Sequence, residues 1–539
     1  MIRRTSLLVL VAACLAASTT ITAQTSSAYA TSPEALHRRL EAFADDSMAG
    51  RSWSGVGHDR ATAYIAREAS LAGLEPAGEN GGWFQTLHMY SRRLASQSRI
   101  GIGARNLLPE RDFKVFSFGK GPPRSLAGVR VVYGGIVGDS TTQISAAAAA
   151  SRVVLLGVPA DMTPERVYRN AGYGPTSRFG RAAAVAIASL DYLPSSQRAI
   201  TSAIGLLDSG TPRADAAPST LLITRDAASL MLGRTLEGAV AGTLGELVED
   251  HLIMDERDVP TRNVIGVLRG RDSTLTGTYV ALGAHSDHIG LRGAPVDHDS
   301  IRAVALAERR SGEGATAANV AALRDSLRRG NRARLDSTFN GADDDGSGVV
   351  ALIEAAHVMA TGPRPRQALL FIWHAAEEDG LVGSAWFVEH PTVPLDSITA
   401  YINLDMVGRG GNGDLANGGP RYLRIIGASR RSPELWPLIE QVNAAAKASF
   451  ALDTADVDGG FCRSDQWSYS RYGIPVAFLT TGSHIDYHAV TDEARYIDYA
   501  KLSAVTVFTI DLARHLADQP LRLRVEGEPL NPKRFCGTR

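Results

Sequence analysis

Residues 279–284 read YVALGA, and this short apolar run is the first of four that predict the fold. The others are 368–373 (ALLFIW), 398–404 (ITAYINL) and 474–480 (IPVAFLT). Near-continuous apolar runs of this length are typical of strands that are buried on both faces. Segments with a helical period, such as 348–359 and 501–516, alternate with them. The pattern predicts an α/β fold with a mostly parallel central sheet flanked by helices.

Histidine and carboxylate residues gather near the downstream ends of these runs. The clusters are His285 to Asp287, Asp343 to Asp345, Glu377 with Glu378, Asp405, and His488. Ligands bind beyond the carboxyl ends of parallel strands, so we expect the clusters to meet at one edge of the sheet. Two imidazoles with three or four carboxylates are a donor set that two divalent metal ions share. Two adjacent glutamates after a buried strand are costly unless cations neutralise them.

Each of these residues taken alone has a simpler interpretation. A single acidic residue in a loop is usually a solvated surface residue. A histidine at the end of an apolar strand is usually a hydrogen-bonded core residue. We keep that interpretation for His288, His374, Asp343 and Asp345, because nothing in their placement distinguishes them.

Five strings together carry a family resemblance. They are GAHSDH (283–288), GADDDGSG (341–348), AAEEDGLVGS (375–384), NLDMVG (403–408) and DYHAVTDE (486–493). In this order, over about residues 251 to 515, the chain resembles the zinc-dependent exopeptidases of the M28 family, the aminopeptidase Y type. The resemblance implies a zinc-peptidase fold of the phosphorylase/hydrolase-like kind and two Zn²⁺ per chain. The implied ligands are His285 and Asp405 for one zinc, Glu378 and His488 for the other, and Asp344 as the bridge.

The resemblance also implies roles for three residues that are not ligands. Glu377 would be the general base, because an unligated carboxylate next to a zinc-activated water can take its proton and pass it to the leaving amine. Asp287 would accept a hydrogen bond from the second ring nitrogen of His285 and so hold its tautomer. Tyr487 resembles a tyrosine that donates to the tetrahedral oxyanion, and a packing role is its alternative interpretation.

The sequence departs from the family pattern in two places. Gln466, in the stretch 463–466, stands where the family often has histidine, so a contact around the metals or the substrate is expected to differ. A long polar insert, 292–340, separates His285 from Asp344, and its part 315–329 has helical periodicity. We expect an exposed helix over the rim of the cleft or a lid, with a solvated surface excursion as the alternative.

Composition excludes one function class, and the N-terminus predicts export. The 539 residues are 44% hydrophobic and carry 56 basic and 57 acidic side chains, so there is no electrostatic footprint for nucleic acid. The start, MIRRTSLLVLVAACLAAS, has the basic and apolar regions of a secretory signal, with a cleavage site at 28–30. We expect a secreted protein, periplasmic or extracellular, with no transmembrane span in the mature chain. Alternatively, residues 11–14 resemble a lipobox, which would make Cys14 a lipid anchor.

The chain is expected to contain five parts. They are a signal peptide (1–30), the N-terminal part of the peptidase domain (31–121), a β-rich insert (122–245), the catalytic zinc-peptidase domain (246–520) and a tail (521–539). The insert resembles a protease-associated (PA) domain, whose role would be a wall for substrate access or packing without substrate contact. Export would permit Cys462 and Cys536 to pair, and two free thiols are the alternative.

The expected function is that of a metallo-exopeptidase, specifically an aminopeptidase that acts on peptide substrates. A carboxypeptidase would use the same metal site and differ in binding a carboxylate, for which Arg409, Arg463 and Arg471 are candidates. A relative of glutaminyl cyclase, with one zinc, and a non-catalytic binding module are further alternatives. The complete set of five ligands and a base favours hydrolysis over both.

Overall fold

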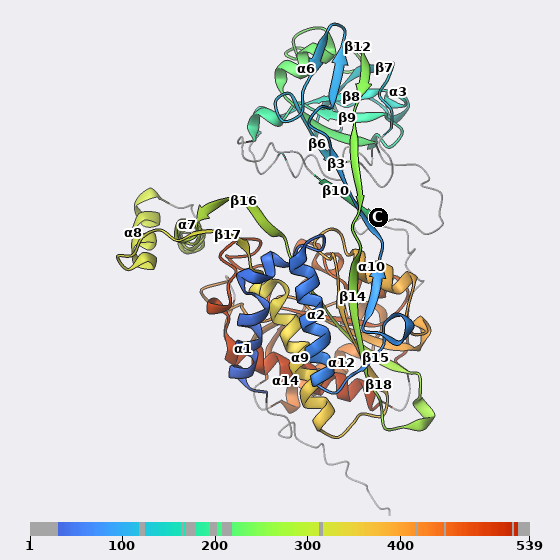
Figure 1. Cartoon of the computed structure of the whole chain (residues 1–539), viewed down its shortest axis with the longest axis vertical. Helices are drawn as coiled ribbons and strands as arrows, with labels where there is room; N and C mark the ends of the chain where they lie inside the picture. Colours follow the sequence, from blue (N-terminus) through green and yellow to red (C-terminus); the bar gives the residue numbers. More distant parts are fainter. Residues whose placement is uncertain are drawn as a thin grey trace, which may run out of the picture.

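A computed structural model describes residues 31–117, 124–162, 167, 178–193, 202–206, 218–311, 316–415, 418–446, 449–519 and 522–526. Its largest sheet has nine strands in the order β1-β14-β18-β15-β19-β22-β20-β21, and β2 also pairs with β14 (Figure 1). The strands are β1 (Glu75–Pro76), β2 (Phe84–Leu87), β14 (Thr261–Leu268), β15 (Tyr279–His285), β18 (Ala368–His374), β19 (Ile398–Leu404), β20 (Tyr422–Ile426), β21 (Ala451–Asp453) and β22 (Val476–Thr480).

The four apolar runs of the sequence form the centre of this sheet. They are β18, β15, β19 and β22, which lie side by side, run parallel and are buried along their whole length. On either side, β14 and β20 pair antiparallel with β18 and β22. The predicted α/β class with a parallel centre is therefore confirmed, and the complete sheet is mixed.

Helices cover both faces of the sheet, because alternate residues of each central strand point to opposite sides. In β15, Val280 and Leu282 join one apolar core, whereas Ala281 joins the other. The first core is completed by α1 (Pro33–Phe43), α2 (Val56–Leu71), α9 (Gly348–Thr361), α11 (Ala428–Arg431), α12 (Leu435–Ala445) and α14 (Tyr499–Ala517). The second is completed by α10 (Val382–Glu389) and α13 (Gln466–Arg471).

Short helical turns join these elements. The 3-10 turns are Asp46–Arg51, Glu79–Gly81, Leu190–Tyr192, Ser273–Leu275, Leu395–Ser397, Val457–Cys462 and Ala494–Tyr496, and a wider turn, Ala342–Ser347, precedes α9.

A second domain lies at one end of the long axis of the molecule (Figure 1). It holds an eight-stranded sheet and its own apolar cores. Its elements are β4 (Arg99–Ile102), β5 (Arg105–Leu107), β6 (Phe113–Ser117), β7 (Val129–Ile136), α3 (Ala146–Ala149), β8 (Val153–Gly157), β9 (Ala184–Ile187), β11 (Ser219–Ile223), α6 (Arg225–Leu232) and β12 (Leu244–His251). A three-stranded sheet of β3 (Met89–Leu94), β10 (Ser202–Leu206) and β13 (Met254–Asp258) leads from one domain to the other.

The second sheet extends beyond the expected insert of residues 122–245 at both ends. Strands β4, β5 and β6 precede residue 122, and β12 continues to His251. The reason is long-range pairing: β12 pairs with both β4 and β7, and β6 pairs with β11. Such pairing leaves no local signal in the sequence.

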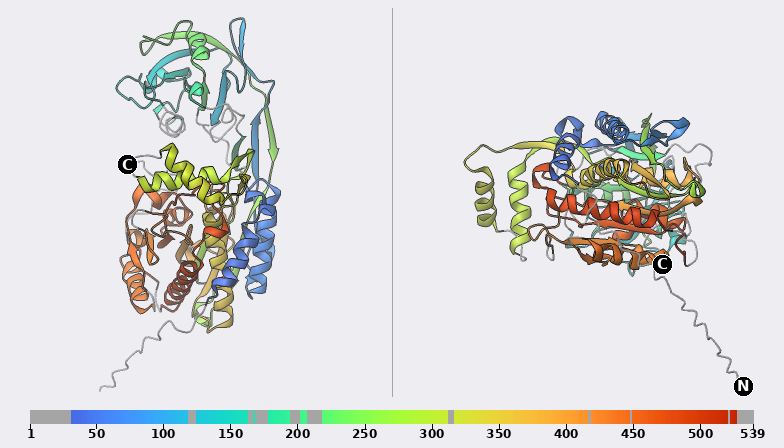
Figure 2. Two further views of the ribbon diagram at one scale, coloured as in Figure 1. Left: turned by 90° about the vertical axis from the view of Figure 1, so that its left-hand side faces the viewer. Right: turned by 90° about the horizontal axis from the view of Figure 1, so that it is seen from below.

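The polar insert between His285 and Asp344 forms an arm that projects from the first domain (Figures 1 and 2). Strands β16 (Gly290–Asp297) and β17 (Leu335–Phe339) pair antiparallel at its base and carry α7 (His298–Ser311) and α8 (Ala317–Arg328). The helix expected over 315–329 is confirmed as α8, and none of its residues is buried.

Several expectations fall on residues outside the described ranges. These are the signal peptide, the lipid anchor at Cys14, and Cys536. Cys462 is disulfide-bonded, so free thiols are excluded for it, and its pairing with Cys536 stays a prediction. Among the described residues, no helix is both long enough and apolar enough to cross a membrane.

Truncation of Leu282 to alanine tests the core of the sheet. Leu282 has no exposed surface, and Leu291, on the arm, is 58% exposed. We expect Leu282→Ala to lower the free energy of unfolding by about 2–5 kcal/mol and Leu291→Ala to lower it by less than about 0.5 kcal/mol. Urea denaturation measures both. Equal losses would contradict the assigned packing.

Candidate metal centre and substrate pocket

The predicted ligands meet at the carboxyl edge of the parallel strands. His285 is the last residue of β15, Asp405 directly follows β19, and Glu378 follows β18 after a short turn. Asp344 lies in the turn before α9, and His488 lies in the loop after β22. The sequence pattern therefore predicted their common location, which is the usual ligand site of a parallel sheet.

Two histidine–carboxylate groups share Asp344. Nε2 of His285 lies 3.1 Å from Oδ1 of Asp344 and 3.7 Å from Oδ1 of Asp405. Nε2 of His488 lies 3.2 Å from Oδ2 of Asp344 and 3.0 Å from Oε2 of Glu378. Each oxygen of Asp344 thus faces a different histidine, which is the arrangement expected of a bridging ligand.

The residues fit a pair of divalent cations. Buried Nε2 of His285, Oδ2 of Asp344 and Oδ1 of Asp405 have no hydrogen-bond partner among the described residues, and buried polar atoms are rarely left so. Burial acts to lower the pKa of His285, but Asp287, Asp344 and Asp405 raise it well above its usual value. The site therefore attracts positive charge. Imidazole and carboxylate donors in this number suit zinc.

Two neighbouring acids contact the backbone and are not assigned as ligands. Asp345 is close to His285 and Asp405. Its Oδ2 accepts from the backbone N–H of His285 at 3.0 Å, and its Oδ1 accepts from that of Gly348 at 3.0 Å. Oδ1 of Asp343 accepts from the backbone N–H of Gly408 at 2.6 Å. Asp343 and Asp345 therefore hold the ligand loops together.

His288 lies inside the site, although the sequence did not distinguish it from a core histidine. Its Nδ1 is 2.6 Å from Oε1 of Glu378, and its buried Nε2 has no hydrogen-bond partner among the described residues. The ring therefore orients the carboxylate of Glu378 toward His488. The signal available in the sequence was its position, three residues after His285 on the same loop.

Asp287 takes a different part from the expected one. Nδ1 of His285 is 3.2 Å from the backbone oxygen of Asp287, whereas the nearest carboxylate oxygen lies at 3.8 Å. The tautomer of His285 is thus set by the main chain at Asp287. The carboxylate instead accepts from the backbone N–H of Glu377 at 3.1 Å. It therefore positions the turn that carries Glu377.

Glu377 lines the pocket beside the ligands and is 9% exposed. Burial, together with the charges of Asp405, Glu378 and Asp465, raises its pKa well above the usual value, against the opposing effect of His285. A carboxyl group with a raised pKa holds a proton more readily, as proton transfer requires.

Tyr487 faces the same pocket from the loop after β22. Its ring stacks on His488, with centroids 3.9 Å apart, and its hydroxyl accepts from Nη2 of Arg463 at 3.2 Å. Because Arg463 occupies an acceptor position of this oxygen, the phenolic hydrogen stays available for donation into the pocket.

Gln466 supports the scaffold and does not line the pocket. It is fully buried, donates to the backbone oxygens of Gly460 and Phe461, and accepts from Nδ2 of Asn403 at 2.9 Å. Replacement of the family histidine by Gln466 thus affects the turn 457–462, which contributes Gly460 to the pocket wall.

Arg51 is a buried contributor that the sequence analysis missed. It has no exposed surface and donates to backbone oxygens of Ser286, Asn340, Gly341 and Asp344. A guanidinium group thereby ties the loop after β15 to the turn that holds the bridging ligand. No local motif marks Arg51, since these four partners are more than 200 residues away in the chain.

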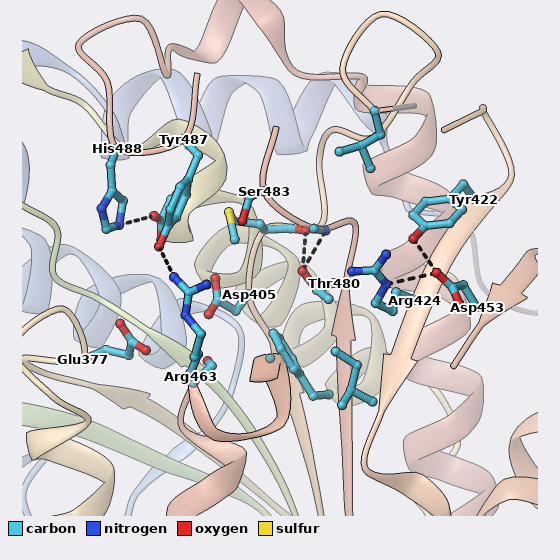
Figure 3. Close-up of a pocket in the computed structure, with 18 of the residues that line it drawn as sticks. Glu377, Asp405, Tyr422, Arg424, Asp453, Arg463, Thr480, Ser483, Tyr487 and His488 are labelled. Atoms are coloured by element: carbon cyan, nitrogen blue, oxygen red, sulfur yellow. Dashed lines mark hydrogen bonds and ion pairs between the residues drawn. The ribbon is translucent and has the colours of Figure 1, made fainter. Parts of the chain in front are cut away.

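The pocket next to the ligands has a volume of about 320 Å³ and two chemically different ends (Figure 3). Glu377, Asp405 and His488 lie at one end, and Tyr422, Arg424 and Asp453 lie at the other. Of the arginines proposed from sequence, Arg463 lines this pocket and Arg471 does not. Arg409 is buried and bonded to Asp414 and Asp486, so its role is structural.

Comparison with known proteins agrees with this geometry. Residues 263–513 match the profile described as "Peptidase family M28". This segment belongs to peptidase family M28. It contains every predicted ligand, and its match confirms the recognition made from the five sequence strings.

Two similar proteins match part of the chain. The chain is 33% identical over 165 residues to "Leupeptin-inactivating enzyme 1" of Streptomyces exfoliatus, covering 30% of this chain and 34% of that protein. It is 30% identical over 187 residues to "Leucine aminopeptidase 1" of Paracoccidioides brasiliensis, covering 33% of this chain and 46% of that protein. The chain thus spans about a third to a half of the length of these relatives.

Two solved structures share the fold over most of the chain. The "Aminopeptidase from Aneurinibacillus sp. strain AM-1" superposes with a TM-score of 0.52 at 17% identity, covering 94% of this chain and 98% of that one. A zinc aminopeptidase from Bacillus subtilis superposes with a TM-score of 0.50 at 16% identity, covering 89% of this chain and 94% of that one. At these identities the likeness shows the fold alone.

Zinc content after dialysis tests the ligand assignment without an activity assay. We expect two zinc ions per wild-type chain, about one in His488→Ala, and less than one in Asp344→Asn, because Asp344 faces both groups. The matched control is Asp396→Asn, an exposed acid at the opposite end of β19 from Asp405, which should keep both ions. Elemental analysis by plasma mass spectrometry gives the count. Full zinc content in Asp344→Asn would contradict the bridge.

Proposed function

We propose that this protein is a zinc-dependent aminopeptidase that removes N-terminal residues from peptides, with two zinc ions per chain. The observation that carries the proposal is the sharing of Asp344 between two histidine–carboxylate groups, beside Glu377 and at the wall of a pocket. Membership of the M28 family supports it. So does the name of the Paracoccidioides relative.

Glu377 performs the proton transfers in this proposal. Zinc bound at the site would supply a Lewis acid that polarises the scissile carbonyl and lowers the pKa of a water molecule. The carboxylate of Glu377 takes a proton from the attacking water and delivers it to the amine that leaves. The hydrogen bond from its backbone N–H to Asp287 fixes the turn during both transfers.

Tyr487 stabilises the oxyanion in this proposal. Its hydroxyl is oriented by the hydrogen bond from Arg463, and its ring is held against His488. A donor directed at a developing negative charge lowers the barrier more than one directed at the ground state.

The name of the Paracoccidioides relative supports an aminopeptidase over a carboxypeptidase. The metal ligands do not decide between the two, because both reactions would use the same metal site.

Export and an access role for the second domain complete the proposal. The disulfide at Cys462 supports an oxidising compartment outside the cytoplasm.

The second domain joins the first through β3 and β13, next to β2 and β14, where Thr261 lies beyond the carboxyl end of β18. This is the edge that carries the site, so a PA-like domain there forms a wall for substrate entry.

Replacement of Glu377 by glutamine tests the base. We expect Glu377→Gln to lower kcat for an N-terminal leucyl anilide by about 10²- to 10⁴-fold, because an amide cannot accept the proton. Zinc content should not change, since Glu377 is not a ligand. The matched control is Glu389→Gln, an exposed glutamate at the end of α10. Near-wild-type turnover by Glu377→Gln would refute the assigned role.

Removal of metal and blocking of the amino group test the reaction class. Chelation by 1,10-phenanthroline should abolish hydrolysis, and added zinc should restore it. Substrates with an acylated N-terminus should not be cleaved, because they lack the ammonium group. Cleavage of such blocked peptides from the carboxyl end would make the protein a carboxypeptidase.

Tyr487→Phe tests the oxyanion donor. We expect kcat to fall on the order of 100-fold with little change in KM, because the lost hydrogen bond forms in the transition state. Tyr64→Phe, on α2, is the matched control and should leave both constants unchanged. A rise in KM with unchanged kcat would instead assign Tyr487 to ground-state binding.

A further inference from the structure

The pocket extends from the metal centre to a polar end that the proposed reaction does not use. Arg424 and Asp453 lie at that end (Figure 3). We infer that Arg424 binds a substrate carboxylate, and that this carboxylate belongs to the side chain of an acidic N-terminal residue. The inference rests on the proposed aminopeptidase function and names its substrate class.

Strand register places this end of the pocket on the same face of the sheet as its apolar wall. Arg424 pairs with Thr480 of β22 and with Asp453 of β21, and Ile426 pairs with Phe478. Side chains two residues apart on a strand share a face. All five of these side chains line the pocket. The arginine is therefore part of the wall that a substrate side chain meets.

Arg424 has open hydrogen-bond donors. Its Nε donates to Oδ2 of Asp453 at 3.1 Å, and its side chain is 17% exposed. The guanidinium also interacts with the hydroxyl of Tyr422, and its terminal nitrogens point away from Asp453 into the pocket (Figure 3). A guanidinium group held by one edge presents its remaining N–H groups in the fork that suits a carboxylate.

Asp453, in contrast, has little acceptor capacity left for a ligand. Its Oδ2 also accepts from the hydroxyl of Tyr422 at 2.8 Å, and its Oδ1 accepts from the backbone N–H of Ala455 at 2.9 Å. Although burial opposes it, these bonds and Arg424 lower the pKa of Asp453, so it stays ionised. This end of the pocket thus offers mainly donors, because three hydrogen bonds already occupy most acceptor positions of Asp453.

Apolar residues separate the polar end from the metal centre. They are Met406, Leu415, Ile426 and Phe478. Asp405 directly follows β19, and Arg424 lies on β20, two strands away, which is a separation of about 10 Å. A glutamate spans about half of that distance from its Cα to its carboxylate, and the arginine side chain covers the rest. A substrate side chain whose methylene groups contact the apolar wall and whose far end carries an anion is that of an acidic residue.

The carboxylate could come from either of two sources, and the observations favour the side chain. The second source is the C-terminal carboxylate of a substrate bound in the opposite direction. In that direction the amine would lie away from the acids at the metal end. Arg463, the other pocket arginine, is at that metal end and donates to Tyr487.

Kinetics with unblocked aminoacyl 4-nitroanilides test the inference on the zinc-loaded full chain. We expect wild-type kcat/KM for the glutamyl substrate to exceed that for the lysyl substrate by at least tenfold. Arg424→Met should lower the ratio of glutamyl to leucyl kcat/KM on the order of 10- to 100-fold, as expected for loss of a charge-assisted hydrogen bond. Arg424→Lys, which keeps the charge, should lose less.

The matched control is Arg421→Met, on the exposed residue that directly precedes β20. It should leave the glutamyl-to-leucyl ratio unchanged. Leucyl hydrolysis by Arg424→Met also reports that this variant is folded. Calorimetric titration with the products L-glutamate and L-leucine repeats the comparison without turnover.

The outcomes separate this inference from the proposed function. A leucyl preference that Arg424→Met does not alter would overturn the inference and leave the aminopeptidase standing. Arg424-dependent cleavage of an N-blocked peptide from its carboxyl end would assign the carboxylate to the C-terminus and overturn both. If no substrate is hydrolysed, the proposed aminopeptidase function is wrong. The calorimetric titration tests the inference independently, because equal affinity for L-glutamate in wild type and Arg424→Met would overturn it.

Discussion

The crowding of buried carboxylates at one edge of the sheet is the constraint on which the site depends, because each buried charge needs a partner. The chain meets this need in two ways. Asp343 and Asp345 accept backbone N–H groups, and so does Asp492, from the main chain of Asp343 and Asp344. Asp344 and Asp405 keep a buried oxygen without a hydrogen-bond partner among the described residues, and so do Asp287, Asp343 and Asp465. Metal ions at this edge would therefore neutralise carboxylates that the scaffold satisfies only in part.

Backbone conformation at the site shows a second constraint. Ala376, Met406 and His488 have φ values of 54°, 56° and 55°, in the left-handed region that residues other than glycine rarely adopt. Each is a site residue or directly adjoins one, and such conformations cost on the order of 1–3 kcal/mol. Neighbouring bonds hold them: the oxygen of Met406 accepts from the N–H of Thr481, and that of Ala376 from the N–H of Val382. The turns are therefore fixed before a ligand binds.

The sequence predicted those features that leave a local or ordered signal. Four apolar runs became the central strands, and the spacing of the clusters brought His285, Asp344 and Glu378 together. It did not predict Arg51, whose partners are remote in the chain, or Arg424, whose role follows from the pairing of three strands. The second domain extended beyond 122–245 for the same reason. The common location of the metal-centre side chains could be predicted from motifs, whereas the far end of the pocket could not.

Both insertions enter the chain where they leave the central pairing intact. The arm starts just after His285 and ends just before Asp344, so its base adjoins two ligand loops. Nε2 of His298, at the start of α7, lies 3.2 Å from Oε2 of Glu493, and Arg302 contacts Asp486. Glu493 and Asp486 are on the loop of Tyr487 and His488. The arm therefore contacts this loop on one side, and Asp492 of the same loop accepts hydrogen bonds from the turn that holds Asp344. The conformation of the arm's base is thereby linked to that of the metal centre.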